Sequence, residues 1–170
     1  AQGLDRAIAG HAQHGGRVLG ICGGLQMLGE ALVDPQDIAG NAPGLGLLPL
    51  VTQFAESKTV CRTRVAFEPL AAPWDALSGL RVEGYEIHQG VTVQHAGMAP
   101  GRIALAGGLG WQDASGRVLG VYLHGLFEDP TVLHALFGAA APTLDTVFDR
   151  LADTAAAHFA TGVLPALIAC

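Results

Sequence analysis

The hydrophobic residues of this chain fall into short runs separated by loops rich in glycine and proline. Residues 2–14 predict a helix, with Leu4 and Ile8 facing inward, and the glycines at 15 and 16 end it. The apolar run at 18–21 predicts a buried strand. A second helix is predicted directly afterwards from the helical spacing of four residues, namely Leu25, Met27, Leu28 and Leu32.

The rest of the chain is predicted to contain mainly strands and then two helices. Strands are expected where apolar residues alternate or cluster, at 47–54, 59–67, 81–88, 91–93, 103–106 and 118–123. The turn at 113–116 predicts a hairpin that joins residues 111–112 to the strand at 118–123. Asp129 and Pro130 open one helix, and the apolar repeat at 144–160 predicts another that packs on the core. This order of elements predicts an α/β fold.

Composition and charge narrow the class of protein. The chain has 170 residues, enough for one domain with a substantial core; half are hydrophobic and 14% are charged. The net charge is −6 and the nine basic residues form no cluster, so nucleic acid is not expected as a partner. There is no 18-residue apolar run and no signal peptide pattern, which predicts a cytoplasmic protein without a membrane partner.

The cysteine at position 22 is the strongest candidate for chemistry. Gly20 and Gly24 bracket Cys22 between the predicted strand and helix, as in the nucleophile elbow of other α/β enzymes. A sharp turn lifts the thiol clear of the sheet, and the positive end of the following helix favours a thiolate. The alternative is a buried structural cysteine at the end of a strand. Cys22, Cys61 and Cys170 show no metal-binding spacing, so no metal site is predicted.

A thiolate nucleophile needs a histidine that accepts and returns its proton. His88 and His124 both lie at the ends of predicted strands, where the sites of α/β sheets gather. Gly125 follows His124 and would let its ring turn toward the elbow. The other five histidines are expected on helix faces or in a loop, namely His11, His14, His95, His134 and His158.

Four ordered motifs carry a family resemblance, and they read GICGGLQMLG, GLGLLP, GYEIHQG and VYLHGLFE. With them the chain resembles the glutamine amidotransferase domain of the cobyric acid synthase family, within the class I amidotransferase superfamily. The resemblance implies a flavodoxin-like parallel sheet with helices on both faces. It also implies a cysteine that attacks the side-chain amide of glutamine. The ammonia would serve an N-terminal, ATP- and Mg-dependent synthetase domain that amidates carboxylates of a corrinoid substrate.

The resemblance assigns roles to individual positions. Cys22 matches the nucleophile and His124 the base, and the backbone N–H of Gly23 is expected to bind the oxyanion. Four further residues are expected to line the glutamine pocket, namely Gln26, His88, Gln89 and Gly90. No cofactor is expected in this domain itself.

Two departures from the family pattern matter. Most class I members have a glutamate two residues after the base, where this chain has Leu126. Glu86 and Glu128 are the alternatives for orienting His124. The other departure concerns the N-terminus, because a helix that leads into a parallel strand implies an earlier strand. Residues 1–170 are therefore expected to be one amidotransferase domain that lacks N-terminal strands and a second oxyanion donor, and that hydrolyses glutamine weakly on its own.

Three other functions remain open from the sequence. One is the amidotransferase of a related cobyrinic acid a,c-diamide synthase or of a cell-wall amidating enzyme. Another is a non-catalytic docking module, in which Cys22 would react no faster than Cys61. The last is a cysteine hydrolase, which needs an open cleft where a glutaminase needs a small pocket.

Overall fold

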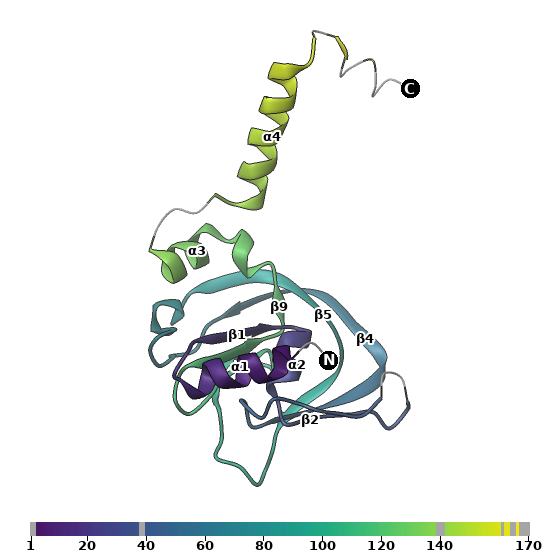
Figure 1. Cartoon of the computed structure of the whole chain (residues 1–170), viewed down its shortest axis with the longest axis vertical. Helices are drawn as coiled ribbons and strands as arrows, with labels where there is room; N and C mark the ends of the chain where they lie inside the picture. Colours follow the sequence, from purple (N-terminus) through teal and green to yellow (C-terminus); the bar gives the residue numbers. More distant parts are fainter. Residues whose placement is uncertain (1–2, 38–39, 139–141, 161, 164–165, 167–170) are drawn as a thin grey trace. The chain divides into compact units, whose positions relative to one another are not determined.

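A computed structural model describes all residues except 1–2, 38–39, 139–141, 161, 164–165 and 167–170. The chain divides into two compact units, Ala1–Leu126 and Phe127–Cys170. The first unit contains both sheets and the predicted catalytic and glutamine-binding residues, whereas Glu128 belongs to the second unit; Figure 1 shows the strands and the helices α1 and α2 of the first unit. The second unit contains the helices α3 and α4.

The four-stranded sheet of the first unit has the order β1-β8-β7-β6. Its strands are β1 (Val18–Ile21), β8 (Val118–Val121), β7 (Gly110–Gln112) and β6 (Arg102–Leu105). β1 pairs with β8 in parallel, whereas β7 pairs with β8 as the predicted antiparallel hairpin. All four residues of β8 are buried, because this strand lies between β1 and β7.

The five-stranded sheet has the order β3-β2-β4-β5-β9. Its strands are β3 (Ala42–Pro43), β2 (Ala31–Val33), β4 (Leu50–Ala66), β5 (Arg81–Gln94) and β9 (Leu123–His124). The predicted strands at 47–54 and 59–67 belong to the single strand β4, and those at 81–88 and 91–93 belong to β5. A register shift between Gln53 and Lys58 of β4 accounts for the break in the sequence pattern. Figure 1 shows β4 and β5 as one long, curved ribbon pair.

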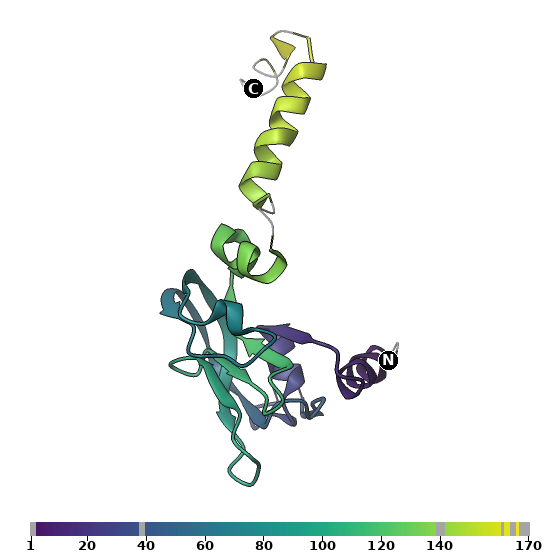
Figure 2. The ribbon, with the colours of Figure 1, turned by 90° about the vertical axis from the view of Figure 1, so that its left-hand side faces the viewer.

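Two helices of the first unit differ from the prediction. α2 (Gly23–Leu28) is shorter than expected, because the chain turns at Gly29 and Leu32 belongs to β2. α1 (Leu4–Gln13) forms where predicted but buries no residue, and Leu4 is 65% exposed. In Figure 2, α1 stands away from the two sheets. The inward placement of Leu4 was therefore wrong.

The α/β class is confirmed, and the parallel pair β1–β8 is the core of the expected sheet. The expected single sheet is nevertheless divided into two. The division occurs at Tyr122, where the strand predicted at 118–123 leaves β8 and continues as β9 in the other sheet. Side chains from both sheets and from α2 fill the core, and the most deeply buried include Leu25, Leu48, Leu50, Leu105, Leu119 and Tyr122.

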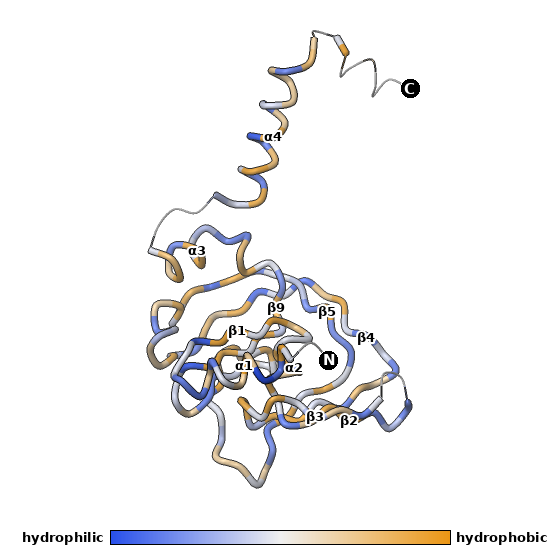
Figure 3. Tube along the Cα trace, in the orientation of Figure 1, coloured by the Kyte–Doolittle hydropathy of each residue, from blue (hydrophilic) through white to orange (hydrophobic). Residues whose placement is uncertain are grey.

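The second unit is helical. α3 (Pro130–Phe137) begins as predicted, with Pro130 in its first turn and the Asp129 carboxylate accepting a hydrogen bond from the Thr131 N–H at 2.8 Å. α4 (Leu144–His158) forms where a helix was predicted and buries no residue within the second unit. Hydrophobic and hydrophilic residues alternate along α4 in Figure 3. Across the described residues, every helix is too short or too polar to span a bilayer.

Candidate functional site

Cys22 occupies a strained turn between β1 and α2. Its backbone has φ 55° and ψ −112°, a region that costs a residue with a side chain about 1–3 kcal/mol. The Cys22 N–H donates to the Val121 carbonyl at 2.8 Å, and the Cys22 carbonyl accepts from the Gln26 N–H at 3.2 Å. β8 and the first turn of α2 thus hold the elbow in place. Strained backbone of this kind clusters at active sites and ligand-binding sites.

A close approach of β1 and α2 lies directly behind the elbow. A Cβ atom on Gly20 would lie 2.5 Å from Leu28 Cδ1 and 2.8 Å from the backbone carbonyl of Gly24. A Cβ atom on Gly24 would meet no atom within 4 Å. Of the two glycines that bracket Cys22, only Gly20 is therefore required for this packing.

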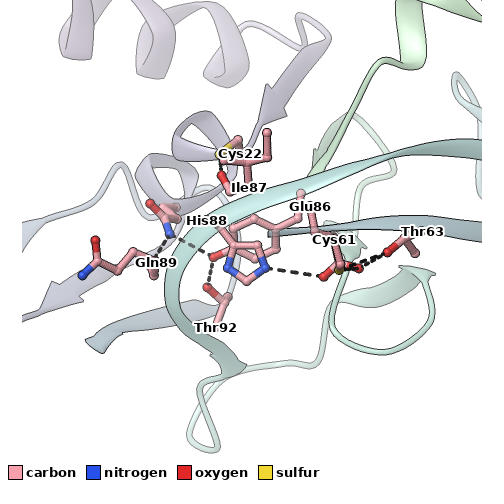
Figure 4. Close-up of polar contacts among 10 residues, drawn as sticks. Cys22, Cys61, Thr63, Glu86, Ile87, His88, Gln89 and Thr92 are labelled. Carbon is pink, nitrogen blue, oxygen red and sulfur yellow. Dashed lines mark hydrogen bonds and ion pairs between the residues drawn. The ribbon is translucent and has the colours of Figure 1, made fainter. Parts of the chain in front are cut away.

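The thiol of Cys22 points at the edge of β5. Its Sγ donates a hydrogen bond to the Ile87 carbonyl at 3.2 Å, as Figure 4 shows. A thiolate cannot donate, so this contact belongs to the neutral thiol. The N–H of Gly23 starts α2 and has no backbone partner within the described chain, which leaves it available beside the sulfur.

His124 lies on β9, which pairs with one side of β5, whereas β4 pairs with the other side. His124 pairs with Tyr85 in the β5–β9 ladder, two residues along β5 from the Ile87 that receives the thiol. At about 3.4 Å per residue, the two positions are roughly 7 Å apart along the strand. A side chain on Gly84 would collide with the His124 carbonyl, so this glycine allows β9 to approach.

The described residues provide no carboxylate partner for His124. Its Nε2 atom is buried and makes no hydrogen bond there. Glu86, one of the two expected alternatives, instead interacts with His88, Thr63 and Cys61. Glu86 is therefore committed to a different histidine.

The imidazole ring of His88 is contacted on one face by Tyr122 and at its Nε2 edge by Glu86. The ring stacks on Tyr122, with centroids 4.0 Å apart and planes inclined by 27°. Its Nε2 lies 3.6 Å from Glu86 Oε2. Its Nδ1 is buried and has no hydrogen-bond partner among the described residues. A polar atom in that position is suited to a ligand, because leaving it unpaired costs free energy.

The remaining predicted pocket residues contribute in different ways. Gln26 Nε2 donates to the Gln89 carbonyl and to the Tyr122 hydroxyl, both at 3.2 Å. The Gln89 side chain is used elsewhere, since its Nε2 donates to the Ala55 carbonyl at 2.8 Å. Gly90 has φ 99°, and a Cβ there would lie 2.5 Å from the Gln53 carbonyl oxygen. Gly90 thus shapes the backbone of β5 at the register shift.

A buried chain of hydroxyl groups, which the sequence pattern did not predict, lies beside Gln26. The Tyr122 hydroxyl lies 2.5 Å from Thr92 Oγ1, and Thr92 Oγ1 lies 2.6 Å from Thr52 Oγ1 (Figure 4 shows Thr92). Thr52 and Thr92 are directly opposite one another on β4 and β5. The signal was weak, because each threonine is one polar residue in an apolar strand and Tyr122 lies within the hydrophobic part of VYLH.

The outer face of β4 and β5 carries charged and aromatic side chains. Arg62 lies over the Tyr85 ring, 5.8 Å from its centroid, and Glu83 bridges Arg62 and Arg64. The hydrogen bond from Arg64, with the positive charge of Arg62 and Arg64, lowers the pKa of the Glu83 carboxyl. This ion-pair cluster is exposed and lies on the opposite face from Glu86 and His88.

A cavity of about 460 Å³ lies between α1, β1 and α2. Its lining is mostly apolar and includes Ile8, Val18, Met27 and Leu45. None of the predicted site residues lines it, so it is not the glutamine pocket. The described residues also contain no group of three or more histidine, cysteine, aspartate or glutamate side chains arranged to bind a metal.

Comparisons with known proteins agree with these features. A sequence model described as the CobB/CobQ-like glutamine amidotransferase domain matches residues 1–132. The cobyric acid synthases of Polaromonas naphthalenivorans (strain CJ2) and Variovorax paradoxus (strain S110) are 63% and 64% identical to 99% of the chain. The chain spans 36% of the length of each of these relatives.

A solved structure shows the same fold. The chain is similar to PurLQS from Thermotoga maritima, with a TM-score of 0.57 over 79% of this chain and 67% of that chain. At 17% identity this likeness concerns the fold alone.

Proposed function

The chain belongs to the CobB/CobQ-like glutamine amidotransferase family, and we propose that Cys22 is the nucleophile that releases ammonia from glutamine. The observation that carries the proposal is the elbow, in which Cys22 adopts φ 55° at the start of α2 and exposes its thiol to the polar edge of β5. A structural cysteine has no need of this strained backbone.

The proposed reaction begins with the neutral thiol. His124 removes the proton from Cys22, which ends the hydrogen bond to the Ile87 carbonyl and frees the sulfur to rotate toward the substrate. The thiolate attacks the side-chain amide carbon, and the Gly23 N–H binds the oxyanion. The imidazolium of His124 then protonates the departing ammonia. Water hydrolyses the thioester to glutamate and regenerates the thiol.

His124 acts in this scheme without a carboxylate. Leu126 occupies the usual position of the third residue, and Glu86 is paired with His88. A thiolate and an imidazolium attract each other directly, so the pair requires less support than a neutral serine and histidine. The thiol lies at the Ile87 position of β5 and His124 lies beside Tyr85, so the two side chains approach each other as the thiol rotates and the substrate binds.

Glutamine binding is assigned to residues of α2 and β5 near the elbow. We place the amino-acid end of glutamine against Gln26, His88 and the backbone at Gln89 and Gly90. Supporting this placement, His88 Nδ1 is buried without a partner in the described structure, and Gln26 lies one turn after Cys22 on α2.

The proposed partner of this domain is the rest of the full-length protein. The chain spans about a third of its cobyric acid synthase relatives. We propose that a synthetase domain, using ATP and Mg²⁺, receives the ammonia and amidates carboxylates of a corrinoid, and that the protein is cytoplasmic. The amidotransferase domain itself requires only glutamine and water.

The experiment that tests this function uses the full-length protein with Cys22→Ala. Amidation supported by glutamine should be lost, whereas amidation supported by free ammonia should continue, because the cysteine only supplies ammonia. Cys61→Ala is the matched control, since Cys61 is an exposed cysteine on β4 outside the elbow, and both activities should persist. Loss of both activities in folded Cys22→Ala protein, or full glutamine-dependent activity, would contradict the proposal.

A further inference from the structure

Tyr122 lies where the two halves of the site meet. It is 1% exposed and is the single residue between β8, which pairs with the strand leading to Cys22, and β9, which carries His124. Its N–H donates to the Leu109 carbonyl at 2.8 Å, which fixes the backbone at this passage between sheets. Tyr122 therefore has a fixed backbone between the strand beside Cys22 and the strand of His124.

The side chain of Tyr122 contacts two of the proposed glutamine-binding residues. Its ring stacks on His88 at 4.0 Å, and its hydroxyl accepts from Gln26 Nε2 at 3.2 Å. Gln26 comes from α2 and His88 from β5, so these residues are 62 positions apart and belong to different motifs. Figure 4 labels His88 and Thr92, the two residues of β5 that contact the Tyr122 side chain.

The Gln89 carbonyl and the Tyr122 hydroxyl hold the Gln26 carboxamide between them. The carboxamide nitrogen has two protons, and the Tyr122 hydroxyl and the Gln89 carbonyl accept one each. The opposite orientation of the amide would place Gln26 Oε1 against the Gln89 carbonyl oxygen, where two acceptors repel. The orientation is thus fixed, and Gln26 Oε1 makes no hydrogen bond within the described residues.

His88 is fixed in a comparable way. Tyr122 covers one face of the ring, and Glu86, itself held by Thr63, lies beside Nε2. Attraction to the Glu86 carboxylate favours the proton on Nε2 and leaves the buried Nδ1 as the free atom. Both residues that carry a free atom contact Tyr122, Gln26 through its amide nitrogen and His88 through the face of its ring.

We propose that Tyr122 is a positioning residue for glutamine, which places the Gln26 carboxamide and the His88 imidazole together for the amino-acid end of the substrate. This inference rests on the proposed function. Tyr122 acts through Gln26 and His88 and takes no part in the chemical step. Because these residues hold an unreacting part of glutamine, their contacts contribute equally to the ground state and the transition state. Loss of the hydroxyl should therefore raise KM and leave kcat nearly unchanged.

The test compares Tyr122→Phe with Thr52→Val in the full-length protein. Tyr122→Phe keeps the stacked ring and removes the hydroxyl that Gln26 uses. Thr52→Val removes a hydroxyl from the far end of the same buried chain, where it contacts Thr92 and none of the proposed glutamine-binding residues. For glutamine hydrolysis, Tyr122→Phe should raise KM about tenfold, the effect of losing one hydrogen bond, with kcat within about twofold. Thr52→Val should leave both constants at wild-type values.

A second measurement separates binding from damage to the elbow. The rate at which Cys22 reacts with iodoacetamide, which lacks an amino-acid end, should be the same in wild type and Tyr122→Phe. The rate with a diazoketone analogue of glutamine should fall in Tyr122→Phe. Thr92→Val, which loosens the Tyr122 hydroxyl without contacting Gln26, provides a replacement if Tyr122→Phe does not fold, and it should raise KM by a smaller factor.

The outcomes distinguish this inference from the proposed function. An unchanged KM in Tyr122→Phe, an equal KM rise in Thr52→Val, or a fall in kcat alone would overturn the positioning role while Cys22 remained the nucleophile. If wild-type protein does not hydrolyse glutamine, or Cys22→Ala still does, the proposed function itself fails. A rise in KM confined to the variants that alter the Tyr122 hydroxyl supports the positioning role.

Discussion

The packing behind the elbow predicts that Gly20→Ala destabilises the first unit and disturbs Cys22. The added methyl group would lie 2.5 Å from Leu28 Cδ1 and 2.8 Å from the carbonyl carbon and oxygen of Gly24. Carbon atoms pack at about 3.5 Å or more, so the shortfall against the Gly24 carbon is about 0.7 Å. The Leu28 methyl can rotate away, but the Gly24 backbone can move only if α2 moves.

The expected cost follows from this displacement. Overpacking that shifts backbone typically costs about 1–3 kcal/mol, and we expect about 2 kcal/mol for Gly20→Ala. In a chain of this size, that loss lowers Tm by about 4–8 °C. Because Cys22 caps α2, a shift of several tenths of an ångström also misplaces the thiol, and kcat/KM for glutamine should fall about tenfold or more.

Tryptophan fluorescence during thermal unfolding is a suitable assay. Both tryptophans, Trp74 and Trp111, are buried in the first unit, so the signal reports on the unit that contains the elbow. Gly24→Ala is the matched control, because its methyl group would meet no atom within 4 Å and would favour the helix by up to about 1 kcal/mol. Wild-type stability in Gly20→Ala, or an equal loss in Gly24→Ala, would refute the packing argument.

Three further predictions concern the base, the second unit and the separate domain. His124→Ala should slow alkylation of Cys22 severalfold near neutral pH, since fewer thiols are ionised; an unchanged rate would transfer the role of base to His88. Asp129→Ala removes the N-cap of α3 and should destabilise that helix by about 1 kcal/mol, seen by circular dichroism, and an unchanged helical signal on heating would contradict the capping role. Purified residues 1–170 should release ammonia from glutamine about 10²-fold more slowly than the full-length protein, and equal rates would show that the rest of the protein contributes nothing to the site.

Local patterns in the sequence determined several features by themselves. Strand, glycine and cysteine spacing predicted the elbow at Cys22, because a sharp turn and the helix after it are encoded by neighbouring residues. The hairpin of β7 and β8 was predicted for the same reason, and its turn is closed by the Asp113 carboxylate, which accepts from the Val118 N–H at 2.8 Å. The start of α3 at Asp129 and Pro130 is likewise local. The motifs also identified the family.

Contacts between distant residues were decided only by the tertiary structure. The thiol of Cys22 meets the carbonyl of Ile87, 65 residues away, and this contact depends on the register of two sheets. Glu86 was a candidate for orienting His124, but in the structure it is paired with His88, two residues along the same face of β5. Tyr122 appeared to be one apolar residue in a continuous strand. Its proposed role depends on the chain passing from one sheet to the other at that residue. The alternation of side chains is the same in β8 and β9, so the sequence pattern does not indicate which strand each of them will pair with.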